Sequence, residues 1–179
     1  MKLISKFIFW LSGWKLNAEI PTYDKMVMIA APHTSNWDFV YARAAFYLMG
    51  IPLRFTIKKE LFFFPLGPIL SAFGGIAIDR SKKGGMVGHM IELYKDRKEL
   101  FILVTPEGTR SKAKNWKKGF YHVALGAGVP ISCGYLDYAK KEAGIGPTVL
   151  PTGDYEKDLE IIQRFYRGVT AKYPEQGVS

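Results

Sequence analysis

Cysteine and acidic residues are scarce in this sequence. The 179 residues contain one cysteine, Cys133, which excludes an internal disulfide framework and a structural zinc site built on cysteines, and which fits a reducing compartment. Asp and Glu number 16 against 25 Lys and Arg, giving a formal charge of +9. Such an excess favours anionic partners: nucleic acid, anionic lipid or a phosphorylated substrate. Charge alone does not choose among them.

The sequence also lacks internal repeats, low-complexity tracts and linker-like segments. A length of 179 residues with 48% hydrophobic content is enough for one domain with its own core. One run, 61–78, has 18 uncharged positions, which meets the length criterion for a membrane span. Pro65, Pro68 and several glycines would break such a helix. We therefore expect broken helices that cover a core, line an apolar groove or dip into a bilayer surface.

An amphipathic helix is predicted for residues 1–16, ahead of a domain over 17–179. Its large apolar residues recur at helical spacing: Leu3, Phe7, Trp10 and Trp14. The charged residues before Glu19 are all basic, and the apolar stretch at 7–14 is too short to span a bilayer and lacks a signal-peptide cleavage site. The pattern is typical of an interfacial helix and equally of a helix packed on the domain.

Strand-like and helical patterns alternate along the rest of the chain. Strands are expected at 26–31, 53–58, 76–78, 100–105, 129–136 and 148–150. Helices are expected at 36–49, 85–97, 118–127 and 155–169. This alternation predicts a single α/β domain with a mixed or largely parallel central sheet flanked by helices.

Two short motifs follow predicted strands. The run HTSNWD occupies 33–38 after the strand at 26–31, and the run PEGTR occupies 106–110 after the strand at 100–105. Sites in open α/β sheets gather outside the carboxyl ends of the strands. The two loops are therefore expected to face one cleft.

His33 is a candidate general base. An imidazole titrates near neutral pH and can take a proton from a hydroxyl, a role worth roughly 10²–10⁴-fold in rate. Asp38 lies five residues on, which in a continuous helix puts the two side chains about 140° apart. Contact therefore requires His33 in the loop before the helix. The spacing from Ser35 to Asp38 also matches a capping box, and one carboxylate can both cap the helix and orient the imidazole.

A tight turn is predicted at four consecutive residues: Glu107, Gly108, Thr109 and Arg110. The turn offers a guanidinium, a hydroxyl and backbone amides, which suit a phosphate. The alternative is an ordinary β-to-α turn with a surface arginine. Arg80 ends another strand-like run and either joins Arg110 at a phosphate or pairs at the surface. Five cations without an acid from Arg110 to Lys118 contact anionic lipid or a phosphorylated cofactor, or form a solvated basic loop.

Taken in order, four blocks resemble the glycerol-phosphate acyltransferase family, which includes bacterial 1-acylglycerol-3-phosphate acyltransferases. The blocks are 33–38, 75–80, 106–111 and 129–131, and the resemblance runs from 27 to 136. It implies transfer of a fatty acyl group from acyl-CoA or acyl carrier protein to the hydroxyl of a lysophospholipid-type acceptor, 1-acylglycerol-3-phosphate first among them. No metal and no further cofactor are implied.

By position, the resemblance makes His33 the general base and Asp38 its orienting partner. It assigns recognition of the acceptor phosphate to a larger set: Arg80, Glu107, Gly108, Thr109 and Arg110. The partners expected are a membrane surface, the lipid acceptor and the thioester donor, and not nucleic acid. The expected location is peripheral, on the cytoplasmic face of a membrane.

Three alternatives remain open. Cys133 and His33 together would make an acyl-accepting nucleophile, although a cysteine inside an apolar run is more often a buried hydrophobe. A non-catalytic module that binds lipid surfaces or nucleic acid explains the charge but leaves His33 and Asp38 without a role. An acyltransferase for another lipid acceptor, such as an amino-acid lipid, fits the motifs as well.

Overall fold

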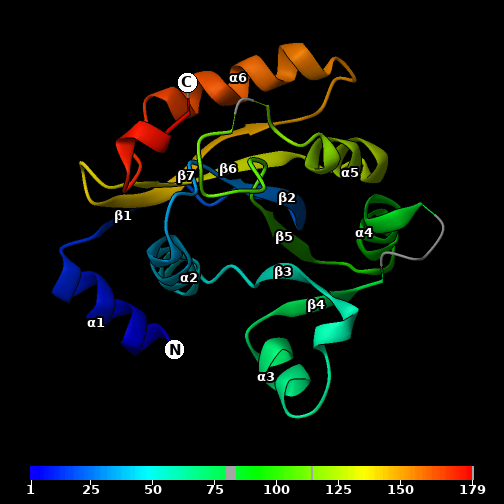
Figure 1. Cartoon of the computed structure of the whole chain (residues 1–179), viewed down its shortest axis with the longest axis horizontal. Coiled ribbons are helices and arrows are strands. Elements are labelled where there is room, and N and C mark those ends of the chain that lie inside the picture. Colours follow the sequence, from blue (N-terminus) through cyan, green and yellow to red (C-terminus); the bar gives the residue numbers. More distant parts are fainter. Residues whose placement is uncertain (80–83, 114, 179) are drawn as a thin grey trace.

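A seven-stranded sheet runs through the centre of the molecule (Figure 1). The computed structural model describes residues 1–79, 84–113 and 115–178. The strands are β1 (Lys15–Ala18), β2 (Lys25–Ala30), β3 (Leu53–Lys58), β4 (Gly75–Ile78), β5 (Leu100–Val104), β6 (Ile131–Asp137) and β7 (Glu142–Val149). The helices are α1 (Lys2–Ser12), α2 (Asn36–Met49), α3 (Leu66–Ala72), α4 (Gly85–Asp96), α5 (Gly119–Ala127) and α6 (Tyr155–Arg167), with short 3₁₀ turns at Lys59–Leu61 and Pro174–Gln176.

The sheet is mostly parallel, as the alternation of elements predicts. Its order is β1-β7-β6-β2-β5-β3-β4, and the antiparallel pair is β6 with β7. Because β2 and β5 are parallel neighbours, the loops that follow them leave the sheet at the same edge. This placement brings the two sequence motifs together.

The edge formed by β1 and β7 differs from the prediction. The sequence indicates a short strand at 148–150, whereas β7 begins at Glu142, and β1 was not expected at all. Glycines and a proline in β7 hide its strand pattern. Gly144 is needed there because a Cβ at this position would collide with the backbone oxygen of Asn17 in β1.

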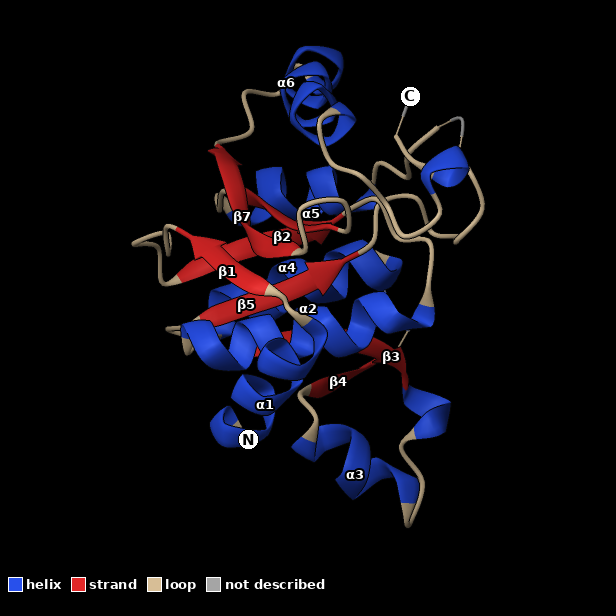
Figure 2. Ribbon diagram, turned by 90° about the vertical axis from the view of Figure 1, so that its left-hand side faces the viewer, coloured by secondary structure: helices blue, strands red, loops and turns tan. Residues whose placement is uncertain are grey.

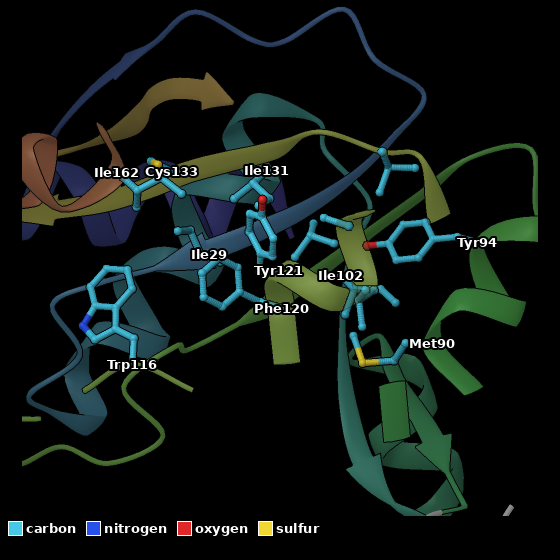
Figure 3. Packing of buried hydrophobic residues seen from close by; sticks show 14 of the residues in the cluster. Ile29, Met90, Tyr94, Ile102, Trp116, Phe120, Tyr121, Ile131, Cys133 and Ile162 are labelled. Atoms are coloured by element: carbon cyan, nitrogen blue, oxygen red, sulfur yellow. The ribbon is translucent and has the colours of Figure 1, made fainter. Parts of the chain in front are cut away.

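Alternating side chains of β2 enter two different cores. Val27 and Ile29 face the larger core, whose helical members include Met90 of α4, Phe120 of α5 and Ile162 of α6 (Figure 3). Met26 and Met28 point to the opposite face, where Phe46 of α2 packs. This two-sided burial explains why β2 reads as a continuous apolar run.

Helix α1 packs on α2 through Phe9, and Gly13 ends it in the left-handed conformation. Trp14 therefore leaves the helical face on which the spacing placed it and is buried. Ile8 is half-buried against the same core, and the other large apolar residues of α1 are exposed: Leu3, Ile4, Phe7, Trp10 and Leu11. The helix thus packs on the domain and also presents an apolar surface.

The expectation that 61–78 covers a core is wrong for its first part. The large apolar side chains before β4 are mostly exposed: Leu61, Phe63, Phe64, Ile69 and Phe73. They lie on the 3₁₀ turn, on α3 and on the adjoining loops, and this region projects from the sheet (Figure 1). Across residues 1–79, 84–113 and 115–178, no helix has the length and apolar character needed to cross a membrane.

Candidate active site

The loop that links β2 to α2 carries the first motif. Ser35 is the amino cap of α2, its hydroxyl accepts a hydrogen bond from Trp37 N at 3.2 Å, and Asp38 completes a capping box. His33 precedes the cap and is not helical. The helix therefore begins after His33, so the wide angle that a continuous helix would set between the side chains of His33 and Asp38 does not apply.

Asp38 is held by hydrogen bonds on both carboxylate oxygens. Its Oδ2 is 3.1 Å from His33 Nδ1 and accepts from the backbone amides of Thr34 at 2.8 Å and Ser35 at 2.9 Å. Its Oδ1 accepts from the hydroxyl of Tyr138 at 2.6 Å. An ionised carboxylate only accepts, so His33 carries its proton on Nδ1 and leaves Nε2 free to accept another.

The electrostatic environment keeps Asp38 ionised. Burial alone would raise its pKa, but the hydrogen bonds from His33, Tyr138 and the two backbone amides outweigh burial and hold the pKa below its usual range. The His33 side chain is 24% exposed, against 9% for Asp38. The pair thus consists of a buried anion and an accessible imidazole, the arrangement that a general base needs.

Glu107 lies behind the histidine loop. Its Oε2 accepts a hydrogen bond from the backbone N–H of His33 at 2.8 Å, and the residue is 6% exposed. Burial raises its pKa, although the hydrogen bond from His33 N opposes that rise. In this structure Glu107 joins the two motifs through the backbone of His33, and it does not line the pocket described next.

His33 and Asp38 lie on the wall of a pocket of about 610 Å³. Much of the lining is apolar and comes from α2, β3, α4, β5 and α5, with members that include Phe39, Ala42, Ala45, Phe46, Met49, Phe55, Met90, Leu103 and Val123. Two alanines on α2 leave room for the pocket. Gly108 and Lys117 also line it, which adds a cation to the same wall.

The remaining predicted site residues lie outside the pocket or outside the described residues. Thr109 is exposed, and its hydroxyl accepts from Ser111 N at 3.2 Å. Arg110 is exposed two residues from Gly108. Arg80 is outside the described residues.

Two residues near the site were not singled out from the sequence. Lys117 belongs to the basic run that ends at Lys118, so the run signalled it only as one cation among five. Tyr138 lies two residues beyond the stretch 27–136 that carries the resemblance, and no local pattern marks it. Its role becomes visible only when β6 places it beside α2.

The structure excludes Cys133 as a nucleophile. The residue is fully buried in β6, packed in the larger core on the face away from α2 (Figure 3). Burial raises the pKa of its thiol to about 12, so the reactive thiolate does not form near neutral pH. Cys133 is one of the buried hydrophobes, as its apolar surroundings in the sequence indicate.

Fold and site together define an α/β protein with a His–Asp pair on the wall of an apolar pocket. The family model Acyltransferase matches residues 16–135. The chain therefore belongs to the acyltransferase family, which confirms the resemblance carried by the four blocks.

Relatives with the same printed name occur in bacteria and plants. The chain is 33% identical over 132 residues to a 1-acyl-sn-glycerol-3-phosphate acyltransferase of Escherichia coli strain K12, covering 68% of this chain and 52% of that protein. It is 36% identical over 136 residues to the Cocos nucifera protein of that name, covering 70% and 42%. The chain thus spans about half the length of the curated relatives it matches.

A solved structure shares the fold. The crystal structure of the 1-acyl-sn-glycerophosphate (LPA) acyltransferase PlsC from Thermotoga maritima superposes with a TM-score of 0.62 at 21% identity. The match covers 96% of this chain and 80% of that chain. The similarity therefore extends beyond residues 16–135 to almost the whole chain.

Proposed function

We propose that this chain transfers a fatty acyl group from a thioester donor, acyl-CoA or acyl carrier protein, to the hydroxyl of 1-acylglycerol-3-phosphate. The observation that carries the proposal is the His33–Asp38 pair on the wall of an apolar pocket of about 610 Å³. The names of the relatives favour this acceptor.

In the proposed reaction His33 Nε2 takes the proton of the acceptor hydroxyl. The oxygen then attacks the thioester carbonyl carbon, and the C–S bond breaks as the new ester forms. The leaving thiolate takes the proton back from His33, so the enzyme ends as it began. Asp38 keeps the proton of His33 on Nδ1 and stabilises the imidazolium that forms between the two transfers. No covalent enzyme intermediate is needed.

The pocket lining suits an acyl chain. Side chains from α2 and β3 such as Phe39, Phe46 and Phe55 offer apolar contact along the pocket. Burying a chain there removes its methylene groups from water, which stabilises the complex by about 0.8 kcal/mol per methylene. The thioester would then lie where the apolar lining meets His33.

Cations near the pocket suit the acceptor phosphate. Lys117 lines the pocket beside Gly108, and Arg110 follows two residues later on the exposed turn. Arg80, which the resemblance assigns to the same role, is proposed with them on its sequence position alone. We expect Lys117→Ala to raise the KM for the acceptor more than it lowers kcat, because the phosphate contact is made before and during the reaction.

The exposed apolar residues of α1 and α3 support peripheral binding to a membrane surface. Both views place these helices at one end of the molecule, away from α6 (Figures 1 and 2). Lys2 and Lys6 on α1 add positive charge for anionic lipid. We propose the cytoplasmic face, where thioester donors are supplied and a free cysteine persists.

A double variant tests this membrane contact. Phe63 and Phe64 changed to Ser should weaken sedimentation with vesicles of phosphatidylcholine and phosphatidylglycerol, while transfer to a short-chain soluble acceptor continues. Tyr23→Ser, another exposed aromatic, serves as the control. Equal vesicle binding by the wild type, the double variant and Tyr23→Ser would show that the region of Phe63 and Phe64 does not contact the membrane.

The function itself is tested by incubating the purified chain with a panel of lysophospholipids and amino-acid lipids, each with acyl-CoA or acyl carrier protein, and reading products by mass spectrometry. Phosphatidic acid from 1-acylglycerol-3-phosphate is the expected product. A product formed with a different acceptor would support acyl transfer as the reaction but would show that 1-acylglycerol-3-phosphate is not the acceptor. Lipid binding without any product would favour the non-catalytic module.

A further inference from the structure

Tyr138 contacts the catalytic pair from an element that lies outside the region matched by the family model. It follows β6 in the turn to β7, and its hydroxyl donates to Asp38 Oδ1 at 2.6 Å. The other three donors to Asp38, His33 among them, all use Oδ2. Among the residues that the structure describes, Tyr138 is therefore the group that fixes the second oxygen and with it the plane of the carboxylate.

Tyr138 is itself held by residues near both ends of the chain, through its ring at one end and through its backbone at the other. Trp14, just after α1, packs edge-on against it with ring centroids 5.0 Å apart, and the same indole stacks on Tyr41 of α2 at 4.7 Å. The backbone N–H of Tyr138 donates to Thr170 O, near the other end of the chain, at 2.9 Å. Burial, followed by the contact with Asp38, raises the pKa of the Tyr138 hydroxyl far above neutral, so it stays protonated as a donor.

We propose that Tyr138 is a positioning residue for the His33–Asp38 pair and that Trp14 holds the tyrosine ring in place. Without the hydroxyl, Oδ1 loses its donor, and the contacts in the described chain that still hold the carboxylate all act on Oδ2, so its plane is less firmly fixed. The negative charge of Asp38, which the Tyr138 hydroxyl had partly offset, then acts more strongly on the imidazole of His33. The kinetic part of this inference rests on the proposed function, and the geometric part does not.

Several titratable groups surround the pair, and they fix the direction of the pH effect. Asp38 faces His33 and Tyr138 directly, with Glu107 beyond the histidine loop and Tyr41 and Tyr173 around Tyr138. Removing the Tyr138 hydroxyl leaves the carboxylate with more charge to stabilise an imidazolium. The acid limb of the kcat/KM profile should therefore move to higher pH.

The kinetic test compares Tyr138→Phe with Tyr41→Phe. Each loses one hydroxyl from a ring packed on Trp14, and in the described chain Tyr41 does not hydrogen-bond Asp38. Tyr138→Phe should lower kcat by about 10-fold, the lower end for a hydrogen bond to a charged group, with the acceptor KM unchanged. Its acid limb should move to higher pH. Tyr41→Phe should match the wild type in both.

A proton NMR measurement tests the geometry without turnover. The proton between His33 Nδ1 and Asp38 should give a low-field resonance that His33→Gln removes. In Tyr138→Phe this resonance should shift and exchange faster with solvent, and Trp14→Leu should show a smaller change of the same kind. Thermal unfolding of each variant confirms that it is folded.

The outcomes separate this inference from the proposed function. If the wild type makes no acyl product but the resonance responds to Tyr138→Phe, the proposed function fails and the positioning contact stands. If Tyr138→Phe matches Tyr41→Phe in kcat, acid limb and resonance, Tyr138 only packs and the inference is overturned.

Discussion

Replacing Asp38 with Asn separates its proposed catalytic role from its role as a helix cap. Three donors converge on Oδ2 and one on Oδ1, so the amide oxygen of Asn takes the Oδ2 position and its NH₂ faces Tyr138. The tyrosine hydroxyl can turn to accept, which preserves the local fold. Hydrogen bonds to a neutral group are about 1 kcal/mol weaker than those to a charged one. We expect the free energy of unfolding at pH 7 to fall by about 2 kcal/mol, allowing for non-additivity.

The effect on rate should be much larger than this loss of stability. Asn cannot stabilise an imidazolium, so kcat should fall roughly 10²–10⁴-fold. A 10³-fold loss corresponds to about 4 kcal/mol. If Asp38 served only as a cap, a domain with about 5–15 kcal/mol of stability would stay folded and active. The assay is acyl transfer at saturating substrates beside urea unfolding of the same samples.

The stability difference between wild type and Asp38→Asn should also depend on pH. Because the pKa of Asp38 is lowered in the folded state, its stabilising contribution is complete above about pH 4 and disappears as pH falls through the folded pKa. The gap in unfolding free energy should therefore narrow toward pH 3. Unchanged turnover in a folded Asn variant would refute the assignment of Asp38 as the partner of the base.

Three more substitutions give distinct expectations. Glu107→Gln keeps an oxygen that can accept from His33 N, so its rate of acyl transfer should stay within about threefold of the wild type. Glu107→Ala loses this acceptor, and its rate should fall by more than about tenfold. Equal rates in the wild type and in Glu107→Ala would show that the contact is dispensable. Cys133→Ala should retain turnover in a thioester assay because the thiol is buried, and complete loss with normal circular dichroism would restore the covalent route. Gly108→Ala places a Cβ 2.5 Å from Lys117 Cε at a φ of +64°, so the acceptor KM should rise, as a titration of initial rates would show.

Much of the fold could be predicted because its central strands are continuous apolar runs. The stretches at β2, β5 and β6 are buried on both faces, which leaves a strong signal in the sequence. The β1–β7 edge could not be predicted, because β1 is a short exposed strand with no apolar pattern. The glycines in β7 are required because other parts of the chain pack closely against them, as Asn17 of β1 packs against Gly144. The local sequence around these glycines does not reveal which distant segment packs against them.

The candidate site was predictable in its centre and not at its periphery. His33 and Asp38 are close in sequence, and a capping-box pattern fixes the turn between them, so their contact follows from local chemistry. Glu107 was expected at a phosphate but lies against the backbone of His33, because only the parallel pairing of β2 and β5 brings it there. Tyr138 is 100 residues from Asp38, a separation that sequence spacing cannot interpret.

The central claim is that the imidazole of His33 removes a proton from an acceptor hydroxyl. The most direct measurement compares wild type and His33→Ala in acyl transfer to 1-acylglycerol-3-phosphate across pH, with His122→Ala, an exposed histidine of α5, as the control. We predict loss of at least about 10²-fold in His33→Ala and wild-type rates in His122→Ala. Comparable rates in a folded His33→Ala protein would contradict the account.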